Sequence, residues 1–536
     1  MAMKARTFLI ALSVTIGLLL IISFGIWRGA AAQSPLNLKN EPITLPSTAK
    51  FFPKEALLTI HLKLDVNRFP RYIEAVVPEK KRNKARSETV KIRNGFFALA
   101  GLDFERDLSS WVNPKFSLSI IKVNGEQEHF GWLLAIQGDD KEGPSSFMKS
   151  FWDKKVLDGE DVLQENYNNF EIYSYNDPLF PKKRKEISTT IVEDKVVLAS
   201  SEKVILKKAI DTSKDPQLSQ LNDQELIQSI EKMNTGIGLI NASEEALETL
   251  LDLPKSLTQK NSLERLVASI KAEGPELLLD GLFKFKESGT EIKSQRESAI
   301  SLVNGSGGPI QDIAILSEPF KLIDSASEDP EAKLLGPILR QYINDLDSTA
   351  INRITNSEKG PLVWINEDAG WIIGTKDNSQ DLEIDKSLRS NGFSKSSLAL
   401  KEKKIDVWSK LAINKSGKYD NIINNVEIIL SQENESNWWG NNIAALEQRL
   451  QVNSLTNNNK RFQNLISNDG NYFDQQVFLG PTSSQKILSD WKPWKLLQAV
   501  IGHSLKQNIK SIAISIGASK DDIEQTINFH AKLLLG

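Results

Sequence analysis

The chain has 536 residues, of which 40% are hydrophobic and 25% are charged, and this balance excludes a chain that is disordered throughout. The 66 Lys and Arg side chains are nearly balanced by 69 Asp and Glu, which disfavours a generally basic nucleic-acid-binding protein but not a local basic patch. There is no cysteine, so disulfides, thiol nucleophiles and Cys-ligated metals are excluded, and four histidines make a His-rich metal site hard to build.

The first segment with a clear pattern is Phe8 to Trp27, which is long, apolar and free of charge. As a helix it would rise about 30 Å, enough to cross the hydrocarbon core of a bilayer. Lys4 and Arg6 precede it, and the positive-inside rule then keeps the N-terminus in the cytoplasm and exports the rest. The sequence therefore predicts a single-pass anchor that contacts the bilayer. Cleavage of a signal peptide after Ala32 is the alternative.

A stem and a first set of elements follow. Gln33 to Thr48 contains three prolines and predicts a linker. The strongest signal after it is a β-hairpin formed by Lys115–Val123 and His129–Gln137 around Asn124-Gly125. Before residue 235 the patterns also predict strands at 56–64, 170–175, 188–192 and 196–200, and helices at 67–77, 145–157 and 202–210.

The second half repeats this order around a hairpin at 362–366 and 370–374. The patterns also predict strands at 235–242, 277–285, 405–408 and 426–431, a C-terminal hairpin at 509–516 and 525–533, and helices at 244–251, 262–272, 381–391, 441–450 and 493–507. The predicted fold class is α+β, with an N-terminal transmembrane helix followed by antiparallel sheets with packed helices.

Three local matches between the halves predict two related units, with chance recurrence of the same elements as the alternative. They are Gly131–Leu134 with Gly370–Ile373 at an offset of 239, Phe170–Ser174 with Ile405–Ser409 at 235, and Val197–Ser200 with Ile428–Ser431 at 231. The predicted division is a cytoplasmic tip and anchor at 1–32, a stem at 33–50, α+β units at 51–225 and 226–455, and a C-terminal extension at 456–536.

Motifs for chemistry are weak. The Ser-x-x-Lys spacing, in which a lysine one helical turn away would activate a serine, occurs three times, at Ser146–Lys149, Ser200–Lys203 and Ser483–Lys486. Lys415-Ser416-Gly417 resembles the later Lys-Thr-Gly triplet of such enzymes, but no Ser-Asp-Asn lies between the motifs. Asp139-Asp140 and Asp521-Asp522 lie in predicted turns, where solvation explains them. No catalytic, cofactor-binding or metal-binding residue is assigned, and no cofactor or small-molecule ligand is predicted.

Two sets of residues are candidates for surface contacts. The basic run from Lys80 to Arg93 suits an anionic lipid surface or an acidic partner, and a solvated loop is the alternative. Trp132, Trp371 and Trp408 lie on predicted strands and are expected in the core, whereas Trp438-Trp439 and the pair Trp491 and Trp494 are candidate exposed anchors for a partner.

The chain resembles a known family. The motifs that carry the resemblance are the anchor and stem, Phe104–Trp111, the run Phe130–Ile136 followed by Phe147, Phe151 and Trp152, the run Val196–Asp211, and the later Gly370-Trp371 hairpin. With these motifs the chain resembles the uncharacterised cyanobacterial membrane-anchored proteins of domain-of-unknown-function family 3352. The resemblance implies a location in the thylakoid lumen or periplasm and no known reaction. We therefore expect a membrane-anchored binding or assembly protein without enzymatic activity, with a membrane protein as the candidate partner and an envelope hydrolase as the alternative function.

Overall fold

A computed structural model of the chain describes most of the residues from 40 onward. The described ranges are 40–63, 102–123, 128–176, 186–250, 263–273, 276–286, 310–345, 360–376, 381–400, 403–416, 419–433, 436–451, 473–491, 509–518 and 526–535, with a few single residues between them.

The structure corrects the prediction of a membrane anchor. Phe8 to Trp27 lies outside the described residues. Within the described ranges, no helix is both long enough and apolar enough to span a bilayer. The structure therefore does not support the transmembrane helix in the predicted fold class, nor the single-pass, signal-anchor localisation that was derived from it. What it supports is a fold of large antiparallel sheets with packed helices.

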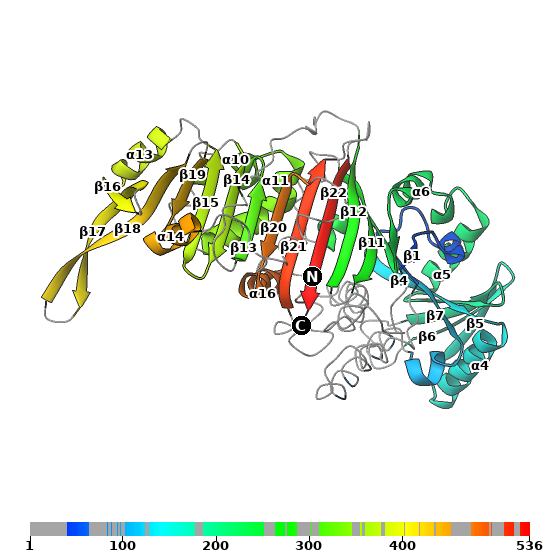
Figure 1. Ribbon diagram of the computed structural model, residues 1–536. Coiled ribbons are helices and arrows are strands. Elements are labelled where there is room, and N and C mark those ends of the chain that lie inside the picture. Colours follow the sequence, from blue (N-terminus) through cyan, green and yellow to red (C-terminus); the bar gives the residue numbers. More distant parts are fainter. Residues whose placement is uncertain are drawn as a thin grey trace.

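Within the described ranges, twenty strands pair into one antiparallel sheet that runs the length of the molecule (Figure 1). From one edge to the other, the order is β5-β6-β7-β8-β4-β3-β2-β10-β11-β12-β22-β21-β20-β13-β14-β15-β19-β18-β17-β16. The strands that come first in sequence are β2 (Leu58–Lys63), β3 (Val112–Val123), β4 (His129–Gly138), β5 (Val162–Tyr167), β6 (Phe170–Asn176), β7 (Glu186–Val192), β8 (Val196–Ser200), β10 (Gly238–Ser243), β11 (Leu263–Glu273) and β12 (Glu276–Phe285). The later ones are β13 (Ile310–Leu316), β14 (Leu362–Glu367), β15 (Gly370–Lys376), β16 (Ser394–Leu400), β17 (Lys403–Ser416), β18 (Tyr419–Glu433), β19 (Ser436–Gly440), β20 (Gln475–Leu479), β21 (Ile509–Ala518) and β22 (Thr526–Leu535). A separate small pair joins β1 (Glu41–Pro42) to β9 (Thr235–Gly236).

The sheet consists of two repeats with the same strand order. We call β2–β8 with β10–β12 the first repeat and β13–β22 the second repeat. We number the ten strands of each repeat by their order along the chain. From the outer edge to the junction between the repeats, they then lie in the order 4-5-6-7-3-2-1-8-9-10 in both. The repeats meet where their last strands, β12 and β22, pair antiparallel. The repeated order supports the duplication hypothesis, while the predicted domain bounds stay a prediction.

The register makes this relation a pseudo-twofold one. If Gly131 is matched to Gly370 and the pairing is followed strand by strand through each repeat, Asp280 becomes the counterpart of His530. Asp280 and His530 are also directly opposite one another in the β12–β22 pair. Equivalent residues that face each other lie on a twofold axis, so the pseudosymmetry axis passes through this pair.

A shared hydrogen-bond pattern confirms the equivalence locally. The Trp132 amide donates to Ser201 Oγ at 3.0 Å, and the Ser201 amide donates to the Trp132 carbonyl at 3.1 Å. In the second repeat the Trp371 amide donates to Asn441 Oδ1 at 3.1 Å, and the Asn441 amide donates to the Trp371 carbonyl at 3.3 Å. The offset of 239 between the glycine-tryptophan motifs is therefore correct. The match of Val197–Ser200 to Ile428–Ser431 is wrong, because β8 corresponds to β19 rather than to β18.

Helices cover both faces of the sheet. One side, which we call the α4 face, is covered by α4 (Glu142–Leu157), α11 (Pro330–Asp345), α13 (Asp381–Ser390) and α16 (Pro481–Asp490) over a core that is continuous through both repeats. The opposite side, the α5 face, carries α5 (Lys203–Lys214) in the first repeat and α14 (Ile443–Gln451) in the second, over separate cores. Most central strands are therefore buried on both sides.

Some of the predicted helices and strands are confirmed, and one predicted helix is wrong. The hairpins at β3–β4, β14–β15 and β21–β22 are confirmed, as is helix α4. The helix predicted at 262–272 is wrong, because this segment is strand β11. Leu266 and Val267 are both buried, on opposite faces, so a central strand with two covered faces produced apolar spacing that resembled a helix. The predicted helices at 67–77 and 493–507 lie outside the described ranges, apart from Lys495.

Candidate functional site

The three Ser-x-x-Lys candidates do not form serine–lysine pairs. Ser146 is exposed on α4, and Ser200 Oγ donates to the Glu202 carbonyl at 2.7 Å. Ser483 Oγ donates to a carboxylate, Oδ2 of Asp312, at 3.0 Å. A serine that donates to a buried carboxylate in this way is held in place by that bond. These contacts give the hydrolase alternative no support.

Only some of the other candidate residues lie within the described ranges. Asp140 Oδ1 accepts the amides of Glu142 and Gly143 at 3.0 and 2.9 Å, so this acidic residue caps the start of α4. Asp521-Asp522 and the basic side chains between Lys80 and Arg93 lie outside the described residues, as do the side chains of Lys415-Ser416-Gly417. Among the residues that the structure describes, no group of three His, Asp or Glu side chains is arranged to hold a metal ion.

The tryptophan predictions are confirmed for the core residues and wrong for one of the two exposed pairs. Trp132, Trp371 and Trp408 are buried, as predicted for core residues. Trp438 and Trp439 are also buried, at 2% and 0% exposure, because they lie on β19 between two covered faces, so the prediction that they are exposed anchors is wrong. Trp491 is 42% exposed directly after α16, and Trp494 lies outside the described residues.

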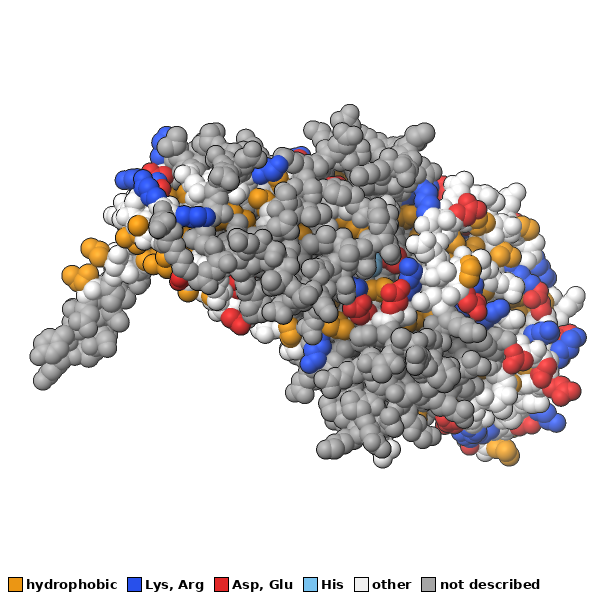
Figure 2. Space-filling model, viewed as in Figure 1, with side chains coloured by type: hydrophobic (Ala, Val, Ile, Leu, Met, Phe, Trp, Pro, Cys, Tyr) orange, Lys and Arg blue, Asp and Glu red, His pale blue; other side chains and the backbone are white. Residues whose placement is uncertain are grey.

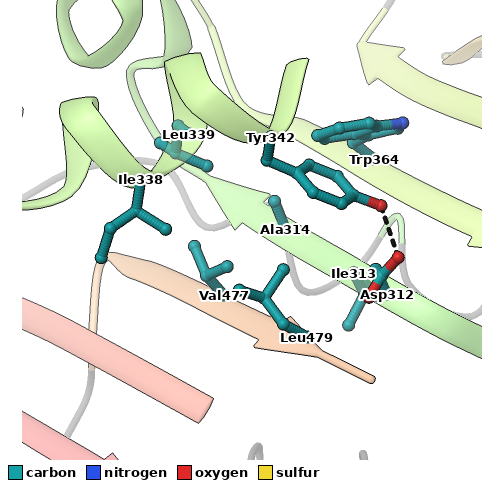
Figure 3. A pocket seen from close by; sticks show the side chains of 9 residues that line it. All are labelled: Asp312, Ile313, Ala314, Ile338, Leu339, Tyr342, Trp364, Val477 and Leu479. Carbon is teal, nitrogen blue, oxygen red and sulfur yellow. Dashed lines mark hydrogen bonds between the residues drawn. The ribbon is translucent and has the colours of Figure 1, made fainter. Parts of the chain in front are cut away.

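A buried carboxylate that the sequence analysis missed is the centre of a polar cluster on the α4 face. Asp312 on β13 is 3% exposed and accepts the hydroxyl of Tyr342, on α11, at 2.6 Å (Figure 3). It also accepts Asn366 Nδ2 at 3.1 Å, the Gly480 amide at 2.8 Å and the Ser483 hydroxyl. Four segments far apart in sequence therefore converge on one side chain.

The environment of Asp312 is otherwise apolar. Beside it, a narrow gap with no room for a water molecule is lined by Ala314, Ile338, Leu339, Trp364, Val477 and Leu479. Burial raises the pKa of Tyr342 well above its usual value, and the charge of Asp312 and its hydrogen bond raise it further. The phenol is thus a fixed donor to the carboxylate. This arrangement ties α11 and the start of α16 to the sheet, which is a structural role.

A second feature is an exposed apolar ribbon at the far end of the second repeat. The strands β17 and β18 pair over their whole length, from Ile405 opposite Ser431 to Ser416 opposite Tyr419. Their neighbours stop earlier: β16 pairs with β17 only as far as Ser409, and β19 pairs with β18 only from Ile429. We call the part beyond these neighbours, residues 410–416 and 419–426, the arm; it projects from the body of the sheet (Figure 1).

The arm exposes large hydrophobic side chains. Leu411 is 71% exposed, Ile422 is 72% exposed and Val426 is 39% exposed. The register places Leu411 and Ile422 on the same side of the ribbon, since Ile422 is opposite Ile413, two residues along from Leu411. Hydrophobic side chains at the base of the arm are visible in Figure 2. A two-stranded ribbon that exposes leucine and isoleucine is unfavourable in water unless a partner covers it.

Sequence reasoning missed both features for identifiable reasons. The signal for Asp312 was present as one charge within an otherwise apolar strand, Ile310–Leu316. The signal for the arm was the sequence Lys415 to Lys418 between two alternating runs, but the predicted strands at 405–408 and 426–431 stopped short of it.

The comparisons with known proteins define the family. The model of the protein family of unknown function DUF3352 matches residues 11–531, so this chain belongs to that family. No curated protein matches the chain. Among solved structures, crystal form I of TP0453 is 7% identical, with a TM-score of 0.28 over 46% of this chain and 82% of that one. Crystal form III of TP0453 is 9% identical, with a TM-score of 0.26 over 48% and 89% of the two chains. Similarity this low supports no conclusion about fold or function.

Proposed function

We propose that this protein is a binding or assembly protein that acts through contacts of its sheet surface rather than by turnover of a substrate. The observation that carries the proposal is the arm, with Leu411 and Ile422 each more than two-thirds exposed. Exposed apolar patches of this kind typically mark protein–protein contact sites. The cyanobacterial character implied by the resemblance is part of this proposal and rests on the sequence motifs alone.

Site-specific photo-crosslinking tests this proposal directly. A photoreactive phenylalanine analogue at Leu411 or Ile422 should form specific adducts with another protein in an extract of the source cells. The matched control is the same analogue at Leu157, which is 85% exposed at the end of α4 in the first repeat. If the arm and Leu157 give the same adducts, or neither gives any, the proposal is wrong.

A variant of the arm provides the second measurement. Leu411→Ser with Ile422→Ser removes the exposed apolar groups without disturbing a buried contact, so the melting temperature should remain close to that of the parent. The adducts formed through a probe at Val426 should then decrease, because the neighbouring apolar contact surface is lost.

A further inference from the structure

The sheet ends in two edge strands of different character. β5 forms one edge and pairs only with β6, and β16 forms the other and pairs only with β17. They are equivalent strands of the two repeats, the fourth in each. Within the described ranges, no strand pairs with the outer side of either one. The two edges can therefore be compared as a pair.

The β16 edge is regular and open. Its seven residues, Ser394–Leu400, pair with β17 without interruption, and all except Leu400 are exposed. Edge strands are normally protected by proline, a bulge or an uncompensated charge. Between Ser394 and Leu400 there is neither proline nor bulge, and the only charge, on Lys395, is paired with Asp406 at 2.8 Å. The strand can thus accept a further strand on its outer side.

On the α5 face of this edge, β16 carries Leu398 and Leu400 beside Ser394 and Ser396. Leu398 is 47% exposed and lies opposite Ile405, a residue of the second-repeat core on that face. Leu400 packs partly against the same core. Side chains of an added strand that point to this face would meet leucine, so apolar residues fit there.

The α4 face of the same edge is basic. The exposed cations Lys386 and Arg389 lie on α13, and Lys395, Lys404 and Lys410 lie on the strands. Among the side chains that the structure describes on α13, β16 and β17, the acidic groups are Asp385, which accepts Arg389 Nε at 2.8 Å, and Asp406. Burial raises the pKa of Asp406, but hydrogen bonds from Lys395 and Ser397 and the charges of Lys395 and Lys404 lower it overall. On the strands at this edge, three lysines, Lys395, Lys404 and Lys410, stand against one carboxylate, Asp406, which leaves a positive excess, and Lys and Arg side chains gather at this end in Figure 2.

The β5 edge differs from the β16 edge in the charge that the strand carries. Glu165 on β5 is paired with Lys203 at 2.9 Å and with Lys207, both on α5. Gln164 donates to the Tyr173 hydroxyl at 3.2 Å. The one charged residue on β5 itself is acidic, Glu165, whereas the one charged residue on β16 is basic, Lys395. This edge is the internal control.

We propose that the outer edge of β16 binds an extended peptide segment as an added strand, with apolar side chains toward the α5 face and acidic side chains toward the α4 face. This rests on the proposed binding function and names its ligand class. Main-chain hydrogen bonds along β16 would hold any extended peptide, whatever its sequence. Leu398 adds an apolar contact, and the cations favour peptides with acidic residues. Alternating apolar and acidic residues follow from the alternation of side chains along a strand.

The test uses the full chain and a labelled eight-residue peptide of alternating valine and glutamate, with binding followed by fluorescence anisotropy. Three control peptides separate the contributions. One has lysine in place of glutamate, one has serine in place of valine, and one is the parent peptide with its central amides N-methylated, which blocks strand pairing. Only the parent peptide should bind strongly, and its affinity should fall with added salt because the cations are exposed.

Variants locate the site. Leu398→Glu should weaken binding of the valine–glutamate peptide roughly tenfold, the scale of one leucine contact. The matched control is Leu163→Glu on β5, since Leu163 is also 47% exposed, and it should leave the affinity unchanged. Lys404→Glu, at an exposed position, should weaken binding severalfold and reduce the salt dependence. Circular dichroism melting shows whether each variant is folded, and Lys404→Glu remains informative if Leu398→Glu does not fold.

Three results would overturn the inference. They are equal binding of the N-methylated peptide, equal weakening by Leu163→Glu, and no binding at peptide concentrations up to about 1 mM, a limit that corresponds to roughly 4 kcal/mol. None of these alters the crosslinking outcome at Leu411 and Ile422. A binding protein that recognises a different ligand is therefore distinguishable from a protein that binds nothing.

Discussion

Removal of the Asp312 carboxylate should be among the most destabilising single changes in the second repeat. Asp312 accepts hydrogen bonds from Tyr342, Asn366, Gly480 and Ser483. Asp312→Ala leaves all four donors without this acceptor. Asn366 and Ser483 are half-buried and can turn toward water, so the lasting cost comes from the buried Tyr342 hydroxyl and Gly480 amide.

The magnitude follows from these two groups. Each buried donor without a partner costs about 1–3 kcal/mol, which gives about 2–6 kcal/mol for Asp312→Ala. Tyr342→Phe removes one donor and keeps the other three contacts, so it should cost about 1 kcal/mol. In the double variant the hydroxyl that lost its acceptor is absent, so the combined cost should fall short of the sum by about 1–3 kcal/mol.

Urea unfolding followed by circular dichroism measures these free energies. Ser483→Ala is the matched control, since it removes a half-buried donor and should cost less than about 1 kcal/mol. A loss below about 0.5 kcal/mol for Asp312→Ala, or strict additivity with Tyr342→Phe, would refute the reasoning that Asp312 is a shared buried acceptor.

Two further predictions concern the first repeat and the repeat symmetry. Burial lowers the pKa of His61 to about 4, against 6.5 for an ordinary histidine. The unfolded chain therefore binds the proton more readily, so stability should be constant above about pH 6.5 and decrease by about 1.4 kcal/mol per pH unit between there and about pH 4. His61→Gln should remove this part of the slope in urea unfolding measured across that range, and an unchanged slope would contradict the assignment. Separately, Ser201→Ala and Asn441→Ala should each lower stability by about 0.5–1.5 kcal/mol, because each removes the same hydrogen bond to a tryptophan amide. A cost for only one of them in thermal unfolding would show that the two contacts are not equivalent.

The sequence by itself determined the elements that depend on neighbouring residues. The hairpins β3–β4 and β14–β15 were predictable because alternating side chains and a tight turn are local properties. Helix α4 and the burial of Trp132 were predictable for the same reason, and the glycine-tryptophan repeat indicated the duplication. The resemblance to the DUF3352 family was confirmed at the level of family membership, since the family model matches residues 11–531.

The tertiary structure decided what depends on pairing between distant segments. Apolar residues on β11 are arranged as on a helix, and only the presence of β10 and β12 on either side makes the segment a strand. The β12–β22 junction joins Asp280 to His530 across 250 residues, and the Asp312 cluster joins residues 312, 342, 366, 480 and 483. Periodicity specifies which side of an element is apolar, but not which other element covers it. Packing of the whole chain decides which elements cover each other. That packing determines the partners of Asp312, the free edge of β16 and the exposed arm.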